Sequence, residues 1–210
     1  MWLKSNGVVG IAGIDTRHLT SLIRDGGPQC AAICHSSGKK MNLLELATRA
    51  RSHPGLNNQD LAKGVACTEP YEWLEGRWSS SGGFSQLTEP RFRVVAIDYG
   101  AKRNILRCLT SAGCKVLVVP PTESAENILS FKPDGIFLSN GPGDPAATGS
   151  YAVPIIRKLL ESQLPTFGIC LGHQLLARSL GAKTTKMDLG HRGANHPVKD
   201  LSTGKVEITT

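Results

Sequence analysis

Short apolar runs alternate with helix-like segments from residue 93 onwards, and this alternation is the strongest constraint on the fold. The runs are typical of buried strands, and the segments between them carry apolar residues at helical spacing. The expected strands cover residues 93–98, 115–119, 135–139 and 165–169, and the expected helices cover 101–112, 123–131 and 151–162. Such alternation predicts βαβ units and an α/β fold with a parallel sheet. Chemistry in these sheets gathers at the carboxyl ends of the strands.

A cysteine follows directly on the fourth expected strand, in the sequence Gly168-Ile169-Cys170-Leu171-Gly172. Gly-x-Cys-x-Gly is the thiol form of a nucleophile elbow, in which the chain turns sharply from strand to helix and needs glycine on both sides. The following helix places N–H groups and the positive end of its dipole beside the sulfur, which favours a thiolate. Cys170 is therefore the candidate nucleophile. The alternative is a buried structural cysteine with two incidental glycine neighbours.

The third expected strand ends in a second unusual segment, residues 139–145, with the sequence Ser-Asn-Gly-Pro-Gly-Asp-Pro. Its glycines allow backbone N–H groups to face a ligand with no Cβ in the way, although a plain loop can have the same composition. Together the two strand ends predict that Cys170 attacks a carboxamide carbon while the N–H groups of Leu171 and Gly141 stabilise the tetrahedral oxygen. Ammonia then leaves, and water hydrolyses the thioester.

The sequence leaves the general base of this scheme open. His173 lies three residues after Cys170 on the same expected helix, so we expect it to serve packing or hydrogen bonding. His191 and His196 lie in a glycine-broken loop that could approach the site. No carboxylate that could orient either ring stands at close spacing.

Residues 1–75 have a different pattern and predict the remainder of a larger domain with a thin core. We expect one helix capped by Asp15 or Thr16 and ended by residues 26–28, and a second helix capped by Asn42. Residues 8–11 and 30–34 are strand candidates. The Ser-, Gly- and Pro-rich residues 76–92 predict a linker, which leaves residues 93–210 as the second domain.

Composition excludes several classes of function. The net charge of +7 comes from basic residues scattered singly or in pairs, so we expect no nucleic-acid partner. No apolar run approaches the roughly 20 residues that cross a bilayer, and the start has no signal-peptide core, which predicts a cytoplasmic protein without a membrane partner. The six cysteines show no zinc-type spacing, so they predict no metal site and mostly reduced thiols.

The motifs carry a family resemblance. Gly-Ile-Cys-Leu-Gly-His-Gln at residues 168–174 resembles the nucleophile motif of class I glutamine amidotransferases, and residues 139–145 resemble their oxyanion loop. Further stretches resemble the small subunits of carbamoyl-phosphate synthases in particular, on both sides of the expected linker. They are residues 13–20, residues 53–56 with 60–62, residues 98–105 and residues 190–197.

The resemblance implies a subunit that hydrolyses glutamine and passes ammonia to a large subunit. That large subunit would use ATP and magnesium to make carbamoyl phosphate for arginine and pyrimidine synthesis, so this chain itself needs no cofactor. By motif matching, Cys170 is implied as the nucleophile, and Gly141, Gly143, Leu171 and Gln174 as positions that bind glutamine and the oxyanion.

The chain also departs from the family pattern. The catalytic His-x-Glu motif and later glutamine contacts are expected beyond Thr210, and an amino-terminal serine that helps to bind glutamine is missing. The resemblance therefore implies a fragment truncated at both ends, with little activity alone. The alternatives are another class I glutamine amidotransferase and a non-catalytic subunit that docks on a synthetase. The sequence leaves open whether the parent is a separate subunit or fused to its synthetase, as well as its effectors and oligomeric state.

Overall fold

The computed structural model describes residues 2–27, 29–36, 38, 40–187 and 195–209. The chain divides into two units, one made of Met1–Pro54 with Thr185–Thr210 and the other of Gly55–Thr184. Residues 55–92 therefore share a unit with the sheet that follows, whereas the sequence places them in a first domain and a linker.

The second unit is built on a five-stranded sheet in the order β1-β5-β4-β6-β7. Neighbouring pairs among β5, β4, β6 and β7 are parallel, so the predicted parallel sheet is confirmed, and Val95 pairs with both Leu117 and Ile136 across the centre. The edge strand β1 runs antiparallel to β5 and is an addition that the sequence did not predict. The strands are β1 (Tyr71–Trp73), β4 (Phe92–Ile97), β5 (Cys114–Val119), β6 (Gly135–Leu138) and β7 (Thr166–Gly168).

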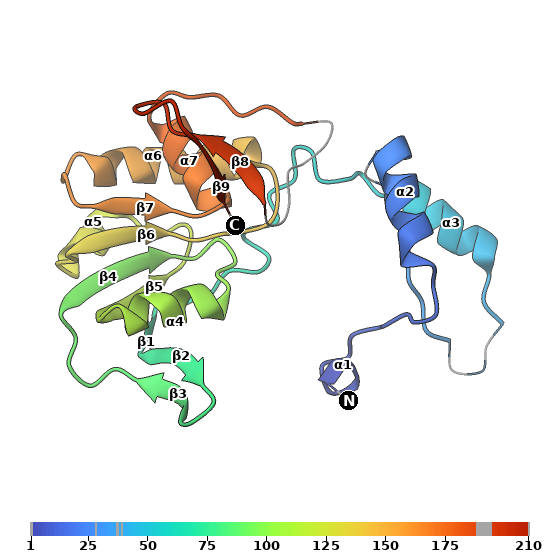
Figure 1. Ribbon diagram of the computed structural model, residues 1–210, viewed down its shortest axis with the longest axis horizontal. Helices are drawn as coiled ribbons and strands as arrows, with labels where there is room; N and C mark the ends of the chain where they lie inside the picture. Colours follow the sequence, from blue (N-terminus) through green and yellow to red (C-terminus); the bar gives the residue numbers. More distant parts are fainter. Residues whose placement is uncertain (1, 28, 37, 39, 188–194, 210) are drawn as a thin grey trace. The chain divides into compact units, whose positions relative to one another are not determined.

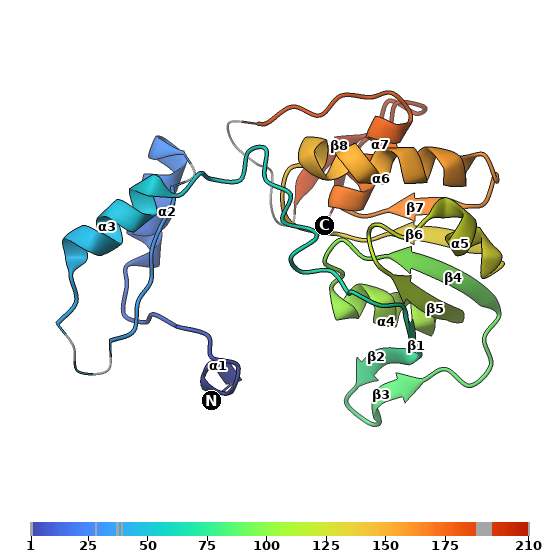
Figure 2. The same ribbon diagram turned by 180° about the vertical axis from the view of Figure 1, so that it is seen from behind.

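Helices cover both faces of this sheet (Figures 1 and 2). Helix α4 packs on one face and α5, α6 and α7 pack on the other. Side chains alternate between the two cores along β4, so Val95 and Ile97 meet the three-helix side and Ala96 meets the α4 side. The helices are α4 (Arg103–Ser111), α5 (Ala125–Ser130), α6 (Pro145–Leu160) and α7 (Leu171–Ser179).

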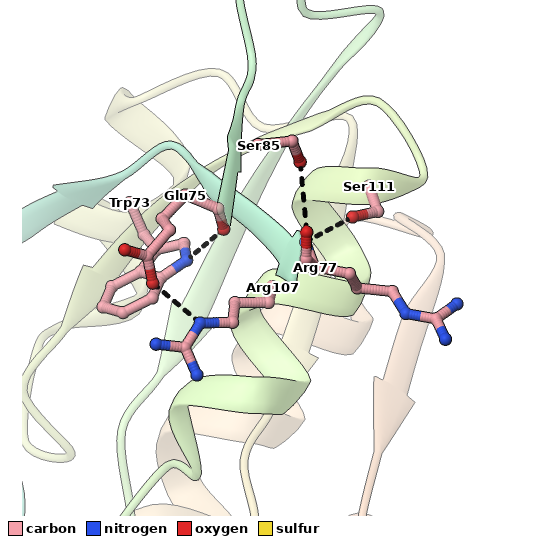
Figure 3. A network of polar contacts seen from close by, with 6 residues as sticks. All are labelled: Trp73, Glu75, Arg77, Ser85, Arg107 and Ser111. Atoms are coloured by element: carbon pink, nitrogen blue, oxygen red, sulfur yellow. Dashed lines mark hydrogen bonds and ion pairs between the residues drawn. The ribbon is translucent and has the colours of Figure 1, made fainter. Parts of the chain in front are cut away.

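The expected linker instead contains a β-hairpin of β2 (Glu75–Ser79) and β3 (Gly83–Gln86), which packs on α4. Figure 3 shows the contacts that hold it. Glu75 accepts from Arg107 Nε at 2.7 Å (Figure 3). The guanidinium of Arg107 also lies 4.0 Å from the ring centre of Phe84. The Ser111 hydroxyl accepts from the N–H of Arg77 at 2.9 Å. The Ser- and Gly-rich sequence is thus the turn of a hairpin, and Phe84 beside it packs on Arg107.

The amino-terminal segment contains α1 (Trp2–Ser5), α2 (Thr16–Gly26) and α3 (Leu43–Ser52). Asp15 caps α2 and Asn42 caps α3 through side-chain oxygens that accept backbone N–H groups, as predicted. The expected strands at 8–11 and 30–34 are wrong, because the described residues there form no strand. None of the three helices buries a residue, which agrees with the expected thin core.

At the other end of the chain, β8 (His196–Lys199) and β9 (Val206–Thr209) form an antiparallel hairpin. The sequence predicts a loop through residue 197, so the first half of this hairpin is a difference from expectation. No helix of the described residues is long and apolar enough to cross a membrane.

Candidate functional site

The site lies where the strand order of the sheet reverses direction. The chain moves from β4 through α4 to β5 on one side, and the next connection brings it through α5 to β6 on the other side of β4. Ligand crevices in open α/β sheets form at such a point, outside the carboxyl ends of the strands. Residues 98–100 follow β4 there, and residues 139–143 follow β6.

Three hydrogen bonds join these two strand ends. The buried hydroxyl of Ser139 accepts from the N–H of Tyr99 at 2.8 Å. The side chain of Asn140 donates to the Gly100 carbonyl at 2.9 Å and accepts from the N–H of Lys102 at 3.0 Å. The polar residues of the 139–145 segment therefore fix its backbone to the end of β4, which is a role that the sequence did not predict.

Gly141 lies at the closest approach of the two strand ends. A Cβ at this position would collide with the carbonyl oxygen of Tyr99 and would stand 2.9 Å from Cδ2 of Leu171. Contacts under 3.0 Å to backbone exclude a side chain, so glycine is required here. The same measurement places Gly141 against the first residue of α7, and this brings together two of the predicted site residues.

The predicted elbow is a sharp turn between β7 and α7. Cys170 has φ 54° and ψ −112°, a region that residues with a side chain rarely occupy. A Cβ on Gly168 would lie 2.6 Å from the backbone of Gly172, and a Cβ on Gly172 would collide with the carbonyl of Leu138. Glycine on both sides is what lets the strand, the turn and the helix pack this closely.

The thiol of Cys170 is exposed at the amino terminus of α7. The N–H of Gly172 donates to the Ser139 carbonyl at 3.0 Å, so this turn of the helix is tied to the β6 loop. The N–H of Leu171 meets no acceptor among the described residues, as is usual in the first turn of a helix. An exposed sulfur beside an unoccupied N–H donor suits nucleophilic attack with stabilisation of an oxyanion.

A segment from the first part of the chain completes the site, and we call residues 55–67 the strap. The N–H of Asn58 donates to the carboxylate of Asp144 at 2.9 Å, and the N–H of Asp144 donates to the Gln59 carbonyl at 2.9 Å. Near the other end of the strap, the N–H of Cys67 donates to the carboxylate of Asp98 at 2.8 Å. The strap therefore touches the loops that follow both β6 and β4.

Comparison with known proteins assigns the chain to a family. The family model described as "Glutamine amidotransferase class-I" matches residues 95–210, which is more than half of the chain. The chain belongs to the class I glutamine amidotransferases.

Curated relatives resemble this amidotransferase along its whole length. A protein named "Carbamoyl phosphate synthase small chain" from Brucella anthropi is 57% identical over 209 residues, which are 100% of this chain and 51% of the relative. Its namesakes from Bradyrhizobium diazoefficiens and Caulobacter vibrioides are 58% and 56% identical, with 53% and 54% of their lengths covered. The chain thus spans about half the length of these curated relatives. A solved structure described as a GMP synthase component from Thermoplasma acidophilum aligns with 51% of each chain, at 24% identity and a TM-score of 0.41.

The remaining predicted residues belong to different parts of the chain. Gln174 is exposed in the first turn of α7, where its N–H donates to the Cys170 carbonyl at 3.0 Å. His173 is exposed beside it. His196 lies in β8, in the other unit, and His191 is outside the described residues. No group of three metal-ligating side chains occurs in the part of the chain that the structure describes.

Burial raises the pKa of thiol and phenol groups near the site. Burial raises the pKa of the Cys67 thiol to about 11, and the neighbouring carboxylate of Asp98 acts in the same direction. Burial also raises the pKa of Tyr99, and burial together with Asp60 raises that of Tyr151. Cys67 is therefore protonated at neutral pH and is a structural thiol of this amidotransferase.

The sequence predicts Gly143 as a site residue but does not predict its contact with the strap. Gly143 has φ +102°, and a Cβ there would lie 2.7 Å from the Gln59 carbonyl, so its glycine is required by the strap. The polar sequence of residues 57–60 shows no periodicity, and nothing local indicates that it would pack against residues more than 80 positions away.

Proposed function

We propose that this chain is the thiol- and glutamine-binding part of a carbamoyl-phosphate synthase small subunit. The observation that carries the proposal is the exposed thiol of Cys170, which stands on a strained turn whose next residue contacts Gly141. The names and the 56–58% identity of the curated relatives support carbamoyl phosphate synthesis as the destination of the ammonia.

In this proposal the thiolate of Cys170 forms a bond to the carboxamide carbon of glutamine. The carbonyl oxygen becomes an oxyanion and accepts hydrogen bonds from the N–H groups of Leu171 and Gly141. The C–N bond then breaks, and the nitrogen takes a proton and leaves as ammonia, which yields a thioester. Water adds to the thioester through a second oxyanion, so glutamate departs and the thiol is restored.

Gly143 and Gln174 are proposed to bind the substrate at two sides of this centre. The backbone of Gly143 lies in the same loop as Gly141, and Gln174 lies one helical turn after Cys170, where its amide can reach a bound glutamine. We assign the proton transfers to a histidine of a His-x-Glu motif outside these 210 residues, because the class I resemblance implies that motif.

The proposed partner is a large subunit that consumes ammonia, bicarbonate and ATP with magnesium, and the words "small chain" in the names of the relatives support it. The product would be carbamoyl phosphate for arginine and pyrimidine synthesis. A non-catalytic docking subunit is the rival, and the two functions differ in whether the site recognises the side chain of glutamine.

A chloroketone analogue of glutamine tests the proposal, because it carries the amino-acid part of the substrate and alkylates a thiol at the carboxamide position. We expect alkylation of Cys170 at least about tenfold faster than that of the exposed Cys108, measured by peptide mass mapping, and slowed by glutamine. Iodoacetamide, which lacks the recognition groups, is the control and should not show this preference. Equal alkylation of all exposed thiols by the chloroketone would contradict the proposal.

A further inference from the structure

One backbone hydrogen bond and one bond to a side chain join the strap to the loop after β6. The N–H of Asp144 donates to the Gln59 carbonyl, and the Asp144 carboxylate accepts from the N–H of Asn58, both at 2.9 Å. A Cβ on Gly143 would lie 2.7 Å from the Gln59 carbonyl and 2.9 Å from the N of Leu61. The loop that carries Gly141 is therefore packed directly on the strap, with no room for a side chain between them.

Asp60 anchors the strap to α6. Its Oδ1 accepts from the hydroxyl of Thr148 at 3.1 Å and from the hydroxyl of Tyr151 at 3.3 Å. Thr148 is fully buried, and the ammonium of Lys63 lies 4.3 Å from the ring centre of Tyr151. These contacts hold the strap against α6, the helix that begins directly after the loop. Asp60 therefore links the two elements that flank residues 141–143, the strap and α6.

The far half of the strap is fixed at the end of β4. Ala62 is fully buried in the core, and a Cβ on Gly100 would lie 2.9 Å from Cγ2 of Val65. The hydrogen bond from the N–H of Cys67 to the carboxylate of Asp98 fixes this end of the strap. Both loops of the switch point therefore rest on one segment, which lies entirely before the residues matched by the family model.

We propose that Asp60 is a positioning residue for the amidotransferase site. It holds the strap against α6, and the strap holds the backbone of residues 141–143 where its N–H groups meet the oxyanion. This inference rests on the proposed function. It places a determinant of glutamine recognition 35 residues before the matched region begins.

Replacement of Asp60 by Ala or Asn separates positioning from folding. We expect D60A to lower the rate of alkylation of Cys170 by the glutamine chloroketone about tenfold in the full chain, because two hydroxyls lose their acceptor. Asp60→Asn keeps an oxygen in the place of Oδ1, so it should stay within about twofold of the unsubstituted chain. Alkylation by iodoacetamide should be unchanged in both variants, since the elbow itself does not touch Asp60.

Two controls keep the test decisive. Asp25→Ala removes an exposed carboxylate in α2 and should leave both rates unchanged. If circular dichroism shows that D60A does not fold, Tyr151→Phe removes one of the two hydroxyls and should slow alkylation by the chloroketone about threefold.

Equal chloroketone rates in D60A and the unsubstituted chain, or an equal loss of rate with iodoacetamide, would overturn the inference. Failure of the proposed function looks different, because the unsubstituted chain itself would then show no preference for Cys170.

Discussion

The hydroxyl of Ser139 lies 2.8 Å from the backbone nitrogen of Tyr99 and accepts its hydrogen bond in the buried interior. The same hydroxyl donates to the Asn140 carbonyl at 2.8 Å. One side chain thus satisfies two backbone groups at the point where β4 and β6 end. The spacing of the two loops that form the site depends on it.

Replacement of Ser139 by Ala should destabilise the fold. The N–H of Tyr99 and the carbonyl of Asn140 would lose their partner in a site with little room for water, which costs about 1–3 kcal/mol of the free energy of unfolding. Urea denaturation measures this quantity. Ser150→Ala, at an exposed position of α6, is the matched control and should cost under about 0.5 kcal/mol. A Ser139→Ala variant as stable as this control would contradict the predicted role.

Substitution of Gly172 by Ala should disrupt the elbow. The added Cβ would collide with the Leu138 carbonyl, so α7 would have to move away from the end of β6. Overpacking of this kind costs about 1–3 kcal/mol, and we also expect slower chloroketone alkylation of Cys170. Thermal unfolding and mass mapping measure the two effects. Gly82→Ala, in the hairpin turn, meets nothing closer than 3.5 Å and should change neither.

Arg107 should hold the β2–β3 hairpin by packing as well as by charge. Its side chain is 18% exposed and that of its partner Glu75 is 31% exposed. We expect Arg107→Ala to destabilise the chain by about 1–2 kcal/mol, because it removes both the ion pair and the stacking on Phe84. Arg107→Lys should recover only part of this, since an ammonium has no flat face to stack. A double-mutant cycle with Glu75→Gln separates the two contributions, and full recovery by Lys would refute the stacking role.

Cys67 should make stability depend on alkaline pH. Burial and Asp98 raise the pKa of its thiol from 9.0 to about 11, so the folded chain holds this proton more tightly than the unfolded chain does. The resulting contribution of Cys67 to the free energy of unfolding is fully present below about pH 9 and is lost as the pH rises towards 11. Denaturation between pH 8 and pH 11 should show a shallower fall for Cys67→Ala. An identical slope in both chains would exclude Cys67 as a cause.

The 210-residue chain alone should release little or no glutamate from glutamine. A general base contributes about 10²–10⁴-fold to such reactions, and we place that base outside this chain. A coupled glutamate assay with Cys170→Ala as the background measures the activity. Release that disappears in this variant would show that the chain supplies its own base.

The sequence by itself determined the elements whose signals are local. Asp15 and Asn42 cap their helices because a side-chain oxygen reaches N–H groups two or three residues ahead. The strand, the cysteine and the helix at residues 166–179 follow in the order that Gly-x-Cys-x-Gly predicts. The strands of the parallel sheet were recognisable because a strand that is buried on both faces has a nearly continuous run of apolar residues.

Only the tertiary structure decided which distant segments meet. Residues 30–34 have strand-like composition and form no strand, since strand formation depends on a neighbouring strand more than on propensity. Residues 76–92 resemble a linker but contain most of a hairpin, because Glu75 and Phe84 contact Arg107 on α4. The strap shows the same principle at the site itself. Asp60 acquires its place through Thr148 and Tyr151, 88 and 91 residues later, and no local pattern encodes a contact over that distance.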